Sequence, residues 1–201
     1  MFNYISLAIP VLFIFFLLLF IFTNRKKVNF DKRIALHESG HAMFLAGYAS
    51  IPKIIHISIE RKNNSYNGFV YSYSEDLDNS NEEHIKFMML NYLAGKMAEK
   101  TCKSLGQINL TNSSDDLRQW NEYALLLIGK DKNKVIQYVN LIVLQYRQER
   151  LIKNFFNDNL MILEEISELL IDKKTLFYKD IQPLLKKVNY PKNFPMISTR
   201  N

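Results

Sequence analysis

The chain has 201 residues, of which 48% are hydrophobic and 23% charged, and its formal net charge is +6. This length suits one domain of moderate size rather than two. The positive charge does not indicate nucleic acid as a partner, because the sequence lacks an Arg-rich helix or an aromatic and basic binding platform. The single cysteine, Cys102, excludes an intramolecular disulfide and is typical of a reducing compartment.

The first distinctive segment is residues 4–23, which carry no charged side chain and are largely apolar. A run of about 20 such residues matches a membrane-spanning helix. A cleaved signal peptide is the alternative, but it would need a basic start and a small-residue cleavage site. We therefore predict an uncleaved transmembrane helix after a short tip (1–3). The basic residues that flank its C-terminal side are Arg25, Lys26, Lys27, Lys32 and Arg33.

These basic residues predict the orientation in the lipid bilayer. The positive-inside rule places the N-terminus outside and the remaining chain in the cytoplasm, as a single-pass membrane protein. Residues 24–30 form a short juxtamembrane linker.

Beyond the linker, apolar periodicity and breaker residues predict a mainly helical (α+β) domain over residues 31–188 and a tail over 189–201. A β-hairpin is expected from two runs rich in β-branched and aromatic residues, 53–60 and 68–74. The predicted helices are 31–48, 80–104, 113–128, 132–157, 159–172 and 178–187.

The first of these helices contains the pentapeptide "HESGH", with His37, Glu38 and His41. The two histidines are four residues apart and so share one helix face. In this pattern the histidines bind zinc, and the glutamate takes a proton from the water that attacks a peptide carbonyl. The alternative is two ordinary histidines without a metal. Gly40 costs the helix about 1 kcal/mol relative to alanine, which predicts the close approach of another backbone or of a substrate.

A catalytic zinc ion needs a third protein ligand. His56, in a predicted strand, and His84, early in a helix, are interpreted as structural. Carboxylates remain: Glu99 in "LAGKMAEK", or Asp115 and Asp116 in "TNSSDDLRQW". The two aspartates lie in the first turn of a helix, where negative charge is favourable in any case. The residues alone leave the third ligand open.

The order of these segments resembles a known family. "ALHESGHA", the hairpin, "YLAGKMAEK" and "TNSSDDLRQWNEYA" resemble the peptidase domain of FtsH-type membrane-anchored zinc proteases. The stretch "LEEISELLIDKKTLFYKDIQPLL" is similar to the end of that domain, so the resemblance covers about residues 30–188.

The resemblance implies a Zn²⁺ cofactor, a protein or peptide substrate and a bacterial inner membrane. It implies His37, His41 and Asp116 as zinc ligands and Glu38 as the general base. Glu99 would orient a zinc-binding histidine. The substrate would add a strand along the edge formed by residues 68–74.

The chain departs from the family in one large respect. FtsH proteins carry an ATP-driven unfoldase between the anchor and the peptidase domain, but here only about seven residues separate them. The phosphate-binding pattern Gly-x-x-x-x-Gly-Lys-Ser/Thr does not occur. We therefore predict a membrane-tethered, ATP-independent zinc endopeptidase that acts on flexible or unfolded proteins. It could form a homo-oligomer or associate with a separate ATP-driven unfoldase.

Two smaller departures lie near the site. Ala94 replaces the first of two family glycines, and Asn112, Ser113 and Ser114 stand where the family usually has a glycine before its third ligand. The missing unfoldase and the altered loop favour an alternative function, a non-catalytic or weakly active FtsH-like adaptor or regulatory subunit of a membrane protease complex. An intramembrane metalloprotease is a further alternative, but "HESGH" lies in a polar context beyond the predicted span.

Overall fold

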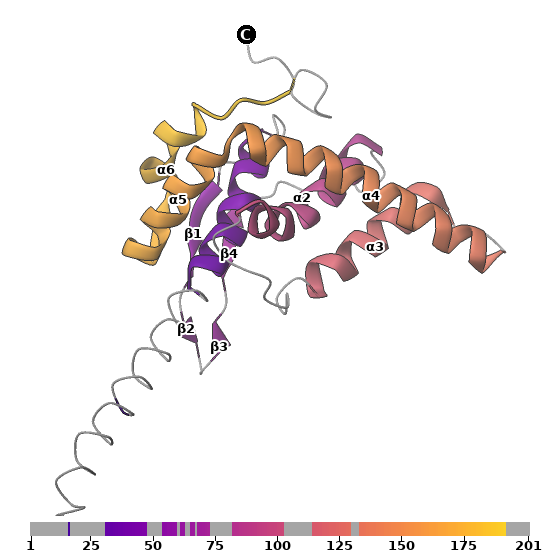
Figure 1. Ribbon diagram of the computed structural model, residues 1–201, viewed down its shortest axis with the longest axis horizontal. Helices are drawn as coiled ribbons and strands as arrows, with labels where there is room; N and C mark the ends of the chain where they lie inside the picture. The colour runs from indigo at the N-terminus through magenta and orange to yellow at the C-terminus, as the bar shows by residue number, and fades with distance from the viewer. Residues whose placement is uncertain are drawn as a thin grey trace, which may run out of the picture.

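The computed structural model describes residues 16, 31–47, 54–59, 61–62, 65–66, 68–72, 82–102, 114–129 and 133–191. This part of the chain is mainly helical with a small antiparallel sheet, as predicted (Figure 1). Close to the predicted ranges lie a helix over residues 31–47, α2 (Glu82–Thr101), α3 (Ser114–Ile128), α4 (Lys134–Asp158), α5 (Leu160–Lys173) and α6 (Tyr178–Leu185).

The predicted membrane span lies outside the described residues, except for residue 16, and so does the linker over residues 24–30. Among the helices that the structure describes, none combines the length and the apolar character that a membrane crossing requires.

The sheet has the strand order β4 (Phe69–Ser72), β1 (Ile54–Ser58) and β5 (Thr175–Phe177), with both pairings antiparallel. The pairing of β1 with β4 confirms the predicted hairpin. Its distal part continues as the short strands β2 (Arg61–Lys62) and β3 (Ser65–Tyr66). In the described sheet, β4 occupies one edge.

The third strand, β5, was not predicted. It is only three residues long and lies between two helices, so it offers no period-two pattern that a sequence could reveal. The chain enters it through Lys174, whose φ of 62° ends α5 in the left-handed conformation. The residues of β5 form a strand because they pair with β1 in the folded structure.

The helix over residues 31–47 is the centre of the domain. Its residues from Arg33 to Leu45 are all buried, which is typical of a helix enclosed on every side. Figure 1 shows it behind β1 and β4, with α2 beside it. At the other end of the chain, Tyr190 donates a hydrogen bond to the Met43 carbonyl (2.6 Å), so the packed domain extends past the predicted boundary at residue 188.

Helix 31–47 packs unusually close to α2 at Gly40. A Cβ atom added there would lie 2.7 Å from Ala98 Cβ and 3.0 Å from the Ala94 carbonyl oxygen. The close approach predicted from this mid-helix glycine is therefore confirmed, and the neighbour is the backbone of α2. This contact brings the side of α2 that carries Gly95 and Glu99 against His37.

Candidate metal site

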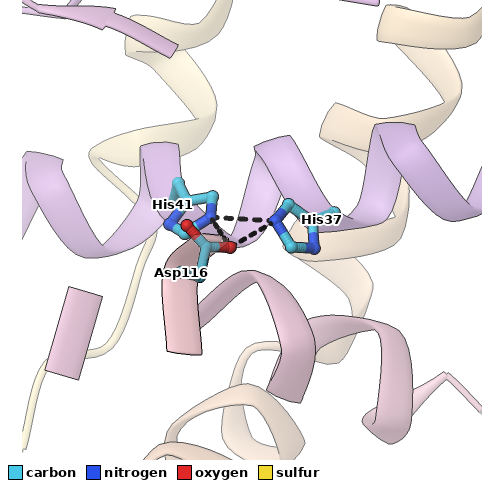
Figure 2. A group of neighbouring side chains, drawn as sticks. All are labelled: His37, His41 and Asp116. Carbon is cyan, nitrogen blue, oxygen red and sulfur yellow. Dashed lines mark hydrogen bonds and ion pairs between the residues drawn. The ribbon is translucent and has the colours of Figure 1, made fainter. Parts of the chain in front are cut away.

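Three potential metal ligands converge where helix 31–47 meets the first turn of α3. His37 Nε2 lies 3.1 Å from His41 Nε2 and 3.0 Å from Asp116 Oδ2, and His41 Nε2 lies 3.5 Å from the same oxygen. Figure 2 shows the two imidazole rings and the carboxylate directed toward one another. His37, His41 and Asp116 thus form a group that could hold a metal ion.

The spacing of these atoms fits tetrahedral coordination. Zinc bonds of 2.0–2.1 Å in a tetrahedron separate neighbouring ligand atoms by about 3.3 Å. The three observed separations, 3.0, 3.1 and 3.5 Å, lie on either side of this value. Small shifts of the rings would suffice to seat an ion between them.

The structure distinguishes between the two aspartates of α3. The Asp115 side chain is 89% exposed and lies 3.8 Å from the Arg118 guanidinium, whereas Asp116 is only 21% exposed and faces the histidines. Neighbouring residues of a helix point about 100° apart, so only one of the pair can face the site. The carboxylate that joins the site is Asp116.

Glu99 contacts His37 on the side of the ring that faces away from Asp116. Its Oε1 accepts a hydrogen bond from His37 Nδ1 (2.7 Å), and its Oε2 pairs with the Arg33 guanidinium. Because Nδ1 is held in this way, Nε2 of His37 is directed toward Asp116. Glu99 is therefore positioned as a partner of a ligand and not as a ligand, the arrangement that the family resemblance implied.

Arg33 corrects one expectation. It was grouped with the basic residues that flank the membrane span, but it is 7% exposed and paired with Glu99. Its position four residues before His37, on the same helix face, was the signal in the sequence.

The hydrogen bonds of the site shift the pKa values of its members. Burial alone would lower the pKa of His37, but the hydrogen bonds to Asp116 and Glu99 outweigh it and raise the pKa to about 10. Burial would likewise raise the pKa of Asp116, yet the hydrogen bonds from His37 and His41 hold it well below its usual range. Without a metal, the site is an imidazolium between two carboxylates, and an incoming cation would replace the proton on His37 Nε2.

Glu38 is buried beside the two histidines, with 7% exposure. Burial raises the pKa of its carboxyl group, and the nearby His41 and His37 partly oppose this. A Cβ atom at Gly68, just before β4, would overlap Glu38 Oε1 and the Ile34 side chain. The glycine therefore lets the start of the edge strand lie directly against this carboxyl group.

Gly95 is a site residue that the sequence did not reveal. A Cβ atom there would lie 2.5 Å from His37 Nε2 and 2.6 Å from two ring carbons, so only glycine leaves room for the imidazole. The preceding Ala94, one of the two departures from the family pattern, is fully buried against Gly40. The glycine that His37 requires is therefore present. The other departure, residues 112–114, lies outside the described residues except for the backbone of Ser114.

The remaining histidines and the cysteine have structural surroundings. His56 is stacked on Tyr71 with ring centroids 5.4 Å apart, and His84 is buried in α2. Cys102 is buried, and its Sγ donates to Glu164 Oε1 at 3.2 Å. In the part of the chain that the structure describes, the group of His37, His41 and Asp116 is the one cluster suited to a metal.

Comparison with known proteins leaves the chain unassigned. It matches no model of a protein family, and no curated protein is significantly similar to it.

Proposed function

We propose that the chain is a membrane-tethered zinc endopeptidase that hydrolyses peptide bonds of flexible or unfolded proteins without ATP. One observation carries the proposal: Glu38 is buried beside a ligand group of two histidines and one carboxylate that has tetrahedral spacing. The resemblance to FtsH-type peptidase domains assigns the same roles to these residues. The tether rests on the charge-free run over residues 4–23.

Zinc is the metal that this donor set favours. Catalytic zinc is commonly held by three protein ligands of imidazole and carboxylate type, with one position left for water or substrate. His37, His41 and Asp116 are such a set. When bound, the ion would polarise the scissile carbonyl and make a water molecule reactive at neutral pH.

Glu38 would move the protons. Its carboxylate would take a proton from the attacking water and deliver it to the leaving amine nitrogen. Burial raises the pKa of this group, which makes its carboxylate a stronger base for the proton of the attacking water.

The edge strand β4 is the proposed binding site for the substrate backbone. β4 lies at the edge of the described sheet, and the glycine before it contacts Glu38. A peptide that extends the sheet beside β4 would be held through its backbone and would pass close to the base. Such binding needs an extended segment, so a folded protein would have to be loosened before it could be cut.

The test combines metal content with cleavage. The full chain in mild detergent should hold one zinc per molecule by elemental analysis and should cleave casein. Glu38→Gln should retain the zinc and lose casein cleavage, because it removes the base but no ligand. Asp115→Asn is the matched control, since it neutralises an exposed carboxylate of α3 and should leave both readouts unchanged.

Two results would decide against the proposal. Cleavage of casein by Glu38→Gln at the wild-type rate would reject the assigned mechanism. Stoichiometric zinc without any cleavage by the wild-type chain would favour the alternative, an FtsH-like adaptor or regulatory subunit that keeps the metal for structure.

A further inference from the structure

The two histidines of the site differ in what holds their second ring nitrogen. His37 Nδ1 donates to Glu99, while the contacts of His41 in the described structure all run through Nε2. A histidine that binds a metal through Nε2 carries its proton on Nδ1, and an acceptor there fixes the ring orientation. By analogy with His37, a group is expected that accepts the Nδ1 proton of His41.

Asn91 of α2 offers an acceptor that nothing else uses. The residue is 8% exposed, and its Oδ1 is buried without a hydrogen-bond partner in the described structure. A buried carbonyl oxygen without a donor is unfavourable, and most such groups in proteins are paired. Asn91 is four residues before Gly95 and eight before Glu99, so it lies on the face of α2 that meets His37. An unpaired amide oxygen on this face indicates a donor that turns toward it in another state.

The packing of the two helices places Asn91 opposite His41. Arg33 pairs with Glu99, His37 meets Gly95, and Phe44 faces Phe87 with ring centroids 6.5 Å apart. The two helices therefore run antiparallel. One turn toward the C-terminus of helix 31–47 corresponds to one turn toward the N-terminus of α2. If this matching continues between the second and third contacts, Asn91 lies at the level of His41.

We propose that Asn91 orients His41: its side-chain carbonyl accepts the Nδ1 proton of His41 when Nε2 binds the metal. Asn91 is then a positioning residue and the counterpart of Glu99 at His37. The inference rests on the metal-binding part of the proposed function and does not depend on peptide hydrolysis.

The distances leave room for this movement. His41 Nε2 is 3.5 Å from Asp116 Oδ2, the longest of the three separations, so this ring is the one that a bound ion would draw inward.

A neutral amide also suits this position. Three carboxyl groups, Glu38, Glu99 and Asp116, already lie in or beside the site, and Arg33 pairs with Glu99. An amide oxygen accepts the hydrogen bond from Nδ1 without adding a charge, and a carboxylate oxygen at the same position would accept the same bond.

The test measures zinc affinity by competition with a chelator of known affinity, using the full chain in detergent and no substrate. Asn91→Leu keeps the branched shape but removes the acceptor and should bind zinc about 10–100-fold more weakly. Asn91→Asp keeps an acceptor and should stay near the wild-type affinity. Ser39→Ala is the matched control, because Ser39 Oγ is also a buried side-chain oxygen without a partner in the described structure, and it should bind zinc as the wild type does.

A nitrogen-15 NMR spectrum of the zinc-loaded chain gives a second readout. The Nδ1–H proton of His41 should be protected from exchange, and Asn91→Asp should shift its resonance strongly, even if the leucine variant does not fold. Wild-type zinc affinity in Asn91→Leu, equal weakening in both variants, or an unmoved His41 resonance would each overturn the inference.

The outcomes also separate this inference from the proposed function. If the affinities follow the expected order but casein is not cleaved, the role of Asn91 stands and the peptidase proposal fails. If the wild-type chain binds no zinc, both are rejected.

Discussion

Protonation of His37 predicts how the stability of the metal-free protein depends on pH. At neutral pH His37 should be an imidazolium held by Asp116 and Glu99, with a pKa raised from 6.5 to about 10. A group whose pKa is raised on folding stabilises the folded state fully below its unfolded pKa, and the effect is lost as pH rises through the folded value. The metal-free chain should therefore lose stability between pH 6.5 and 10.

The magnitude follows from the size of the shift. Each pKa unit corresponds to about 1.36 kcal/mol, so a rise from 6.5 to about 10 is worth at most about 5 kcal/mol of the free energy of unfolding. The His37 side chain is only 7% exposed, so solvent screens little of it. The pKa of Asp116 lies far below this range, and its shift reflects the same interaction with His37. Its contribution to the free energy of unfolding is therefore not added to that of His37.

Urea unfolding of the full chain in detergent with a chelator, at several pH values from 6 to 10, measures this loss. Asp116→Asn should show a smaller loss, because it removes one of the two carboxylates that stabilise the imidazolium. With excess zinc the His37 contribution to the slope should disappear, since the metal has already displaced the proton. A wild-type stability that does not change from pH 6.5 to 10, or an equal slope in Asp116→Asn, would refute the reasoning.

Three further predictions concern the residues around the ligands. Gly95→Ala should reduce zinc affinity at least 10-fold in chelator competition, because its Cβ would occupy the space of the His37 ring; Ala94→Gly, which changes the neighbouring residue, should not. Glu99→Ala should lower the free energy of unfolding by about 3–5 kcal/mol in urea titration, since it removes the carboxylate that pairs with the buried Arg33 and accepts from His37 Nδ1. Asp115→Ala should leave the zinc content unchanged by elemental analysis. A loss of zinc as large as that caused by Asp116→Ala would contradict the assignment of Asp116 as the ligand.

Much of the fold could be predicted because its signals are local. Apolar periodicity and breaker residues predicted each helix that the structure describes, and the runs around β1 and β4 predicted the hairpin. The strand β5 could not be predicted in this way, since three residues carry too little pattern and their pairing depends on β1.

The sequence by itself determined that His37 and His41 share a helix face with Glu38 beside them, because a spacing of four residues fixes this in any helix. The family resemblance implied Asp116 and Glu99, but only the tertiary structure shows that Asp116 faces the histidines, that Glu99 contacts both His37 and Arg33, and that Gly95 makes room for the ring. These contacts join residues 58 to 79 positions apart. Their geometry depends on how helix 31–47, α2 and α3 pack against one another, and no local pattern encodes that packing.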